Sequence, residues 1–144
     1  MTEAERVALM ADLRRDEGVR YSAYQDSLGY WTIGCGRLID ARFGDGLTPE
    51  EVDYLLENDV ADTAREVYAA WPWVAGLDAV RRRVLMNMAF NLGVPKLKLF
   101  KATLAAVAQG DYVKASEQML KSRWAGQVGA RAQRLARMMA TGVV

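Results

Sequence analysis

A strong helix-start signal at Thr48 divides the sequence into two parts of different character. A cap residue, a proline at the first helical position and acids in the first turn follow one another in Thr48-Pro49-Glu50-Glu51, as expected at a helix N-terminus. Apolar residues then recur at helical spacing to about residue 70: Val52, Leu55, Leu56, Val60, Ala64 and Val67. A helix of about 20 residues is about 30 Å long, which is enough to connect two lobes.

The part before this helix is rich in glycine and aromatic residues. A capping box at Thr2–Glu5 predicts a helix over about residues 2–15. Residues 21–25 and 30–36 have strand-like composition and flank a turn at 26–29, which predicts a small antiparallel hairpin or sheet. Little of this part is expected to form a deep core.

The part after the long helix is predicted to be entirely helical. Asp78 is placed to cap a helix that ends at Gly93-Val94-Pro95, with Val80, Val84, Leu85, Met88 and Leu92 facing inward. Shorter helices are predicted over about residues 97–109, 112–120 and 130–139. Trp71, Trp73 and Trp124 lie at helix faces or ends, so we expect them in the core, with an exposed 71–73 loop as the alternative.

We therefore predict an α+β fold in a single domain of residues 1–144. A small sheet-containing lobe (about 16–50) is joined by a connecting helix (about 49–70) to a larger helical lobe (about 71–144). The N-terminal helix over residues 2–15 is assigned to the helical lobe, and an active-site cleft is expected between the two lobes.

The composition excludes several kinds of chemistry. Histidine is absent, which removes Ser-His-Asp and Cys-His catalysis and histidine-ligated zinc. No metal or cofactor is expected, so acid–base chemistry falls to carboxylates, Lys, Tyr or Cys. Cys35 is the single cysteine, and we expect it to be a small buried strand residue.

The small net charge of +1 hides an asymmetry along the chain. Residues 1–74 carry 7 Lys/Arg and 15 Asp/Glu, whereas residues 75–144 carry 12 and 3. The basic part indicates an anionic partner, although mutual attraction of the two parts and simple solvation explain the pattern equally well. The basic amphipathic segment 131–139 is either a membrane-surface helix or a helix packed on the large lobe.

Two carboxylates and a hydroxyl stand close together in the glycine-rich part. Glu17 lies where a helix gives way to glycine, Asp26 lies at a hairpin turn, and Thr32 lies on the adjacent strand. Two carboxylates in unlike environments are what glycoside hydrolysis requires, one to protonate the leaving oxygen and one to activate water or hold positive charge. The alternative is a purely structural role, in which Glu17 neutralises a nearby arginine and Asp26 shapes the turn. The spacing of these residues alone favours this structural interpretation.

The surroundings reverse this preference. The segment "DEGVRYSAYQDSLGYWTIGCGRL" (16–38) resembles the active-site segment of the phage-type lysozymes, a group of endolysins in glycoside hydrolase family 24. "LDAVRRRVLMNMAFNLG" (77–93) is similar to the central buried helix of that family, and "KSRWAGQVGARAQR" (121–134) to its Trp-bearing C-terminal segment. These segments follow one another in the same order as in the family, and the likeness spans nearly the whole chain.

The resemblance implies a role for each matching residue. Glu17 matches the general acid, Asp26 the second carboxylate, and Thr32 the residue that orients the attacking water. Arg131 matches a basic residue that pairs with the catalytic glutamate. Saccharide contacts are implied at Leu38, Phe90, Thr103 and Gln118, and Gly36 would allow close approach of the chain to the sugar.

Three features depart from the family pattern. Arg37 stands where histidine is common, so a structural ion pair is either lost or replaced by one that does not titrate near neutral pH. Segment 39–48 is short, which predicts a trimmed sheet. An aromatic tail is missing after residue 144, so we expect the last helix to be less firmly docked.

The resemblance implies a bacteriolytic muramidase that cuts the β-1,4 bond between N-acetylmuramic acid and N-acetylglucosamine in peptidoglycan. A lytic transglycosylase and a non-catalytic binder of anionic envelope are the alternatives, and Asp26 and Thr32 argue against the first. We expect a monomer that binds no nucleic acid and inserts in no membrane, with weak contact of its basic part to the anionic envelope. Without an export signal, it is expected in the host cytoplasm until a holin releases it to the periplasmic peptidoglycan.

Overall fold

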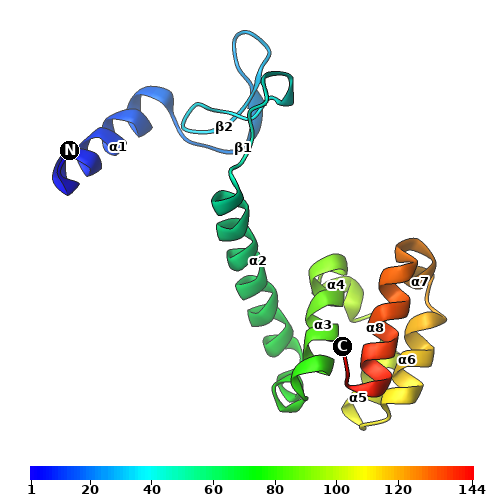
Figure 1. The fold of residues 1–144 in the computed structure, drawn as a ribbon. Coiled ribbons are helices and arrows are strands. Elements are labelled where there is room, and N and C mark those ends of the chain that lie inside the picture. The colour runs from blue at the N-terminus through cyan, green and yellow to red at the C-terminus, as the bar shows by residue number, and fades with distance from the viewer. The chain divides into compact units, whose positions relative to one another are not determined.

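The computed structural model describes residues 1–144, which form two compact units, Met1–Tyr54 and Leu55–Val144. The elements in chain order are α1 (Glu3–Glu17), β1 (Arg20–Gln25), β2 (Trp31–Gly34), β3 (Arg37–Leu38), the 3-10 helix η1 (Ala41–Phe43), α2 (Pro49–Ala70), the 3-10 helix η2 (Pro72–Gly76), α3 (Ala79–Leu92), α4 (Val94–Leu97), α5 (Lys101–Ala108), α6 (Tyr112–Leu120), α7 (Arg123–Val128) and α8 (Ala130–Thr141) (Figure 1). A mostly helical chain with one small sheet confirms the predicted α+β class.

The first unit begins with the capped helix α1. Thr2 Oγ1 accepts a hydrogen bond from the Glu5 N–H at 3.2 Å, and the Glu5 side chain accepts one from the Thr2 N–H, so the predicted capping box is confirmed. No residue of α1 is buried. The helix ends at Glu17 because Gly18 adopts a positive φ of 72°, a conformation that favours glycine.

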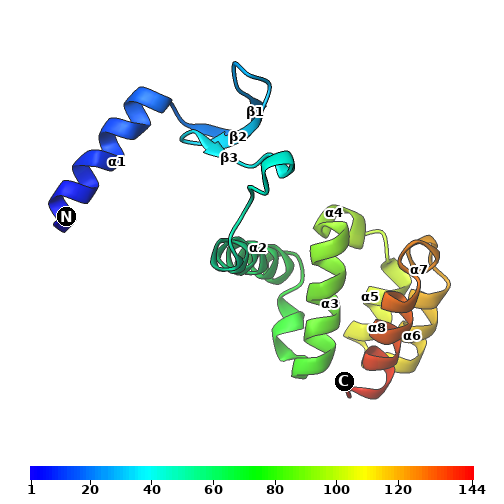
Figure 2. The ribbon, with the colours of Figure 1, turned by 45° about the horizontal axis from the view of Figure 1, so that its top comes forward.

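The sheet of the first unit has three antiparallel strands in the order β1-β2-β3 (Figure 2). Tyr24 lies opposite Thr32, and Thr32 lies opposite Leu38. The sequence predicted one continuous strand over 30–36, but the chain turns at residues 35–36 to form β3. Cys35 is therefore an exposed turn residue, and the expectation of a buried strand cysteine is wrong.

Helix α2 begins as predicted and links the sequences of the two units. The Thr48 hydroxyl accepts from the Glu51 N–H at 3.3 Å, while the Glu51 carboxylate accepts from the Thr48 N–H at 2.8 Å. Of the predicted apolar stripe, Val67 is buried, whereas Leu56 and Val60 are about half exposed and line a pocket of the second unit.

The second unit contains the main hydrophobic core. Its buried side chains come from α2, η2 and α3 to α8, and include Val67, Val74, Val84, Leu85, Met88, Leu97, Val107, Met119, Trp124, Leu135 and Met139. The predicted helix over 97–109 divides into the end of α4 and all of α5, and α7 was not predicted. Trp71 and Trp73 pack partly buried against the core, so the alternative of an exposed loop is wrong.

Helix α8 is firmly packed, contrary to the expectation of a weakly docked last helix. Its buried residues are Ala132, Leu135, Ala136, Met138 and Met139. The Arg81 guanidinium also donates to the carbonyls of Met139 at 2.8 Å and Ala140 at 3.1 Å. The same group pairs with Asp78 and lies 3.8 Å from the ring centroid of Tyr112, so one side chain ties α3, α6 and α8 together.

The packing of α8 decides between the two interpretations of segment 131–139. Because its apolar side chains are in the core, this face is not free to lie in a membrane surface. None of the helices combines the length and the apolar character needed to cross a membrane.

Candidate active site

Glu17 lies against the turn between β2 and β3. Its side chain is exposed at the end of α1, and a Cβ built on Gly36 would lie 3.2 Å from Glu17 Oε2. Gly36 also has a positive φ of 74°. The absence of a side chain at residue 36 therefore lets the Glu17 carboxylate approach this turn closely.

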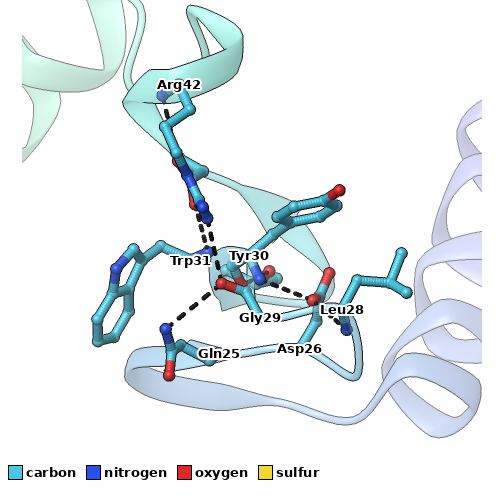
Figure 3. Close-up of polar contacts among 9 residues, drawn as sticks. Gln25, Asp26, Leu28, Gly29, Tyr30, Trp31 and Arg42 are labelled. Atoms are coloured by element: carbon cyan, nitrogen blue, oxygen red, sulfur yellow. Dashed lines mark hydrogen bonds and ion pairs between the residues drawn. The ribbon is translucent and has the colours of Figure 1, made fainter.

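Asp26 organises the turn between β1 and β2. Its Oδ1 accepts hydrogen bonds from the N–H groups of Leu28 and Tyr30, each at 2.9 Å (Figure 3). Its backbone N–H donates to the Tyr30 carbonyl, and its carbonyl accepts from the Gly29 N–H. Oδ2 accepts no hydrogen bond within the unit. One carboxylate oxygen therefore stabilises the turn, while the other has no hydrogen-bond partner and can contact a water molecule or substrate. A structural role and a catalytic role of Asp26 are therefore compatible.

Thr32 sits in the middle strand of the sheet. Its side chain is 4% exposed, and its hydroxyl donates to the Tyr30 carbonyl at 3.2 Å. Because directly opposed residues project on the same face of a sheet, Tyr24, Thr32 and Leu38 share one face. The first unit thus brings Thr32 together with the candidate saccharide contact Leu38.

Arg37 forms an ion pair with Glu51. Its guanidinium makes two hydrogen bonds to the Glu51 carboxylate, at 2.9 and 3.0 Å, and donates to the Gly46 carbonyl at 2.9 Å. The Thr48 N–H, followed by Arg37, lowers the pKa of Glu51. This pair connects β3 to the first turn of α2 in the same unit.

Asp40 is a residue that sequence reasoning missed. Its carboxylate is 3% exposed and accepts from the Trp31 N–H at 3.1 Å and from the backbone and guanidinium of Arg42. The Arg42 side chain is the largest cause that holds the pKa of Asp40 well below its usual range. The only signal in the sequence is an aspartate that can cap a short helical turn at residues 41–43.

Two candidate saccharide contacts share one pocket of the second unit. This pocket has a volume of about 640 Å³ and is lined by Thr103, Gln118 and the aromatic rings of Phe100 and Trp124. Thr103 is only 2% exposed, so little of its surface reaches the pocket. The pocket lining also includes four cations and no acidic residue: Lys96, Lys101, Lys121 and Arg123.

Phe90 and Arg131 line a second, more apolar pocket of about 390 Å³ in the same unit. Arg131 Nε donates to Asn87 Oδ1 at 2.9 Å, and Arg131 Nη2 donates to the Asn87 carbonyl at 3.3 Å. Asn87 on α3 therefore fixes the guanidinium of Arg131. Sequence reasoning missed Asn87, as it missed Asn91, whose side chain accepts from the Trp124 indole at 2.8 Å.

Nowhere in the structure do three or more Cys, Asp or Glu side chains gather in a way that could hold an ion. The chemistry available to the first unit is that of two carboxylates, Glu17 and Asp26, and the hydroxyl of Thr32. Such a set suits acid–base hydrolysis.

Comparison with known proteins gives one family. The family model described as phage lysozyme matches residues 14–139. The pre-baseplate central spike protein Gp5 of Enterobacteria phage T4 is 33% identical over 90% of this chain, which spans only 27% of Gp5. The probable T4-type lysozyme 1 of Dictyostelium discoideum is 26% identical over 92% of this chain and 93% of its own length. An endolysin of Acyrthosiphon pisum secondary endosymbiont phage 1 is 28% identical over 76% of this chain and 73% of its own length.

The Asp40 carboxylate makes a testable prediction about pH. Because its folded-state pKa is depressed, it stabilises the protein above its ordinary pKa of about 4, and this contribution is lost as pH falls below that value. The difference in free energy of unfolding between wild type and Asp40→Asn should therefore be larger at pH 7 than at pH 3. Urea unfolding at both pH values measures it. The exposed Asp45, replaced by asparagine, is the control, and an equal difference at both pH values would contradict the assignment.

Proposed function

The chain belongs to the phage lysozyme family, and we propose that it hydrolyses the β-1,4 bond between N-acetylmuramic acid and N-acetylglucosamine in bacterial peptidoglycan. The observation that carries this proposal is the meeting of Glu17 with Gly36, at the turn that follows the strand of Thr32. The exposed Glu17 carboxylate is accessible to a polymeric substrate.

In the proposed mechanism Glu17 protonates the leaving glycosidic oxygen. Asp26, through its free Oδ2, and the Thr32 hydroxyl hold the attacking water on the opposite side of the sugar. By family resemblance the reaction inverts the configuration at the anomeric carbon, which requires carboxyl groups about 6.5–9.5 Å apart, compared with about 5–5.5 Å in a retaining enzyme.

The remaining site residues are proposed on the same resemblance. Leu38 and Gly36 contribute saccharide contacts from the first unit, and Phe90, Thr103 and Gln118 contribute them from the second. Arg131, held by Asn87, is the proposed partner of the catalytic glutamate. We further propose that the protein acts as a monomer.

The two alternative functions are less well supported. A lytic transglycosylase needs a glutamate but no attacking water, so Asp26 and Thr32 would have no catalytic role. A membrane-disrupting helix over 131–139 would have to expose side chains that are buried in α8.

The route to the substrate is a further part of the proposal. By resemblance to endolysins, the protein waits in the host cytoplasm until a holin opens the membrane. A second possibility is a lysozyme segment within a larger virion protein, which the likeness to the phage T4 central spike protein favours.

Replacing the proposed acid tests the mechanism. Glu17→Gln should lower the rate of peptidoglycan hydrolysis by about 10²- to 10⁴-fold because the variant cannot donate the proton. It should remain folded, since Glu17 is exposed at a helix end. Turbidity loss of purified cell walls measures the rate, and mass spectrometry of wild-type products should find reducing ends rather than anhydro-muramic ends.

The neighbouring acid provides the control for this experiment. Asp16 is exposed and pairs only with Arg15, so Asp16→Asn should retain wild-type turnover. Wild-type lysis by Glu17→Gln would exclude Glu17 as the acid. Anhydro-muramic ends in the wild-type products would show that the enzyme is a lytic transglycosylase and not a hydrolase.

The basic lining of the larger pocket makes a second prediction about substrate binding. Stem peptides of peptidoglycan carry free carboxylates, which cations on the pocket rim would attract. Lys101→Glu should raise KM for peptidoglycan about threefold to tenfold at low salt with little change in kcat. The effect should disappear near 1 M salt, where the Debye length is about 3 Å.

Lys114 lies on α6 outside this pocket, and Lys114→Glu produces the same change in net charge. Equal effects of the two variants would mean that net charge, and not the pocket, attracts the polymer.

A further inference from the structure

Arg42, which lies in η1 and not in the turn itself, holds the turn that carries Asp26. The Arg42 Nη2 donates to the Gly29 carbonyl at 3.2 Å, and the Gln25 side-chain amide reaches the same carbonyl at 3.4 Å (Figure 3). The Gly29 N–H in turn donates to the Asp26 carbonyl at 3.0 Å. The guanidinium therefore holds one end of the turn whose other end is Asp26.

The same guanidinium is fixed by the buried Asp40. Arg42 Nε and Nη2 each bond to a different oxygen of the Asp40 carboxylate, at 2.8 and 2.5 Å. A two-point pair of this kind sets the orientation of both groups. Asp40 Oδ2 also accepts from the Trp31 N–H, so the carboxylate and the guanidinium together grip the backbone at residues 29 and 31.

Two of the three proposed catalytic residues, Asp26 and Thr32, depend on the short segment 29–31 whose two ends these bonds hold. Tyr30 lies in its middle: its N–H bonds to Asp26 Oδ1, and its carbonyl accepts from the Thr32 hydroxyl. The Tyr30 ring is also held, 4.8 Å from the ring of Phe43 in an edge-on arrangement and 5.4 Å from the Arg42 guanidinium. A shift of residues 29–31 would therefore move the Asp26 carboxylate and the Thr32 hydroxyl together.

We propose that Asp40 and Arg42 are positioning residues for the hydrolytic reaction, which hold Asp26 and Thr32 in register for the attacking water. This inference rests on the proposed function of Asp26 and Thr32. Neither positioning residue needs to touch substrate, because their effect passes through the backbone of residues 29–31. Errors of about 1 Å in the placement of reacting groups lower the rate by up to about 10²-fold. Loss of the Asp40–Arg42 pair should therefore affect kcat more than substrate binding.

The Arg37–Glu51 pair provides a matched control within the same unit. It is also a two-point arginine–carboxylate pair with a third bond to a backbone carbonyl. It joins β3 to α2 and makes no hydrogen bond to residues 26–32. Loss of this pair removes a comparable set of contacts and leaves the turn bonds in place.

The test compares Arg42→Ala, Arg42→Lys and Asp40→Asn with Arg37→Ala, all confirmed as folded by circular dichroism. Arg42→Ala should lower kcat about tenfold with KM within about twofold, and Arg42→Lys should recover part of the loss because it retains the charge. Asp40→Asn should resemble Arg42→Lys, since an amide keeps the shape and one acceptor oxygen. Arg37→Ala should retain kcat within about twofold.

Hydrogen exchange gives a readout that does not depend on activity. The amides of Leu28 and Tyr30 bond to Asp26 and not to Arg42. Their exchange should become at least about tenfold faster in Arg42→Ala and stay unchanged in Arg37→Ala. If Arg42→Ala does not fold, Arg42→Lys and Asp40→Asn provide the same comparison with smaller effects.

The outcomes separate this inference from the proposed function. Wild-type turnover by Glu17→Gln in the same assay would overturn the proposed function, whatever Arg42 does. If Glu17→Gln shows the expected loss of rate but the Arg42 and Asp40 variants keep wild-type kcat, the positioning role alone is wrong. A kcat loss equal to that of Arg37→Ala, with unchanged exchange of Leu28 and Tyr30, would also overturn it.

Discussion

The close approach of Glu17 to Gly36 is the contact on which the candidate site depends. A helix must end at residue 17, a strand must turn at residues 35–36, and no side chain can stand between them. Positive φ angles at Gly18 and Gly36 meet the first two requirements, and the missing Cβ of Gly36 meets the third. The carboxylate is thereby placed beside the strands that carry Thr32 and Leu38.

The two units are stabilised in different ways. The second unit has a continuous apolar core, whereas in the first unit the buried residues are Thr32 and Asp40, both polar. Polar bonds therefore hold the small sheet: Asp26 to its turn, Asp40 to Trp31 and Arg42, and Arg37 to Glu51. Such bonds have directional geometry that apolar packing lacks, and this suits the proposed role of the unit in fixing reactive groups.

Local signals in the sequence predicted much of the fold. Thr2, Thr48 and Asp78 each cap a helix as expected, because a cap and the backbone N–H groups that donate to it lie within a few residues. Helix α7 was missed although Ser122 caps it, since six residues are too few to display a periodic pattern. The strand pattern misled at Cys35, where glycines on both sides turn the chain out of the sheet.

The candidate site was predictable only in part, for a related reason. The family pattern identified Glu17, Asp26 and Thr32 because these residues stand in one continuous run of sequence. Asp40 and Asn87 were missed because their partners, Trp31 and Arg131, lie 9 and 44 positions away.

The decisive measurement is the kcat of Gly36→Ala against that of Gly34→Ala, since both glycines have positive φ but only a Cβ at residue 36 would meet Glu17. The account predicts a kcat about tenfold to a hundredfold lower for Gly36→Ala than for Gly34→Ala at similar stability. Equal kcat values would contradict the placement of the acid at this turn.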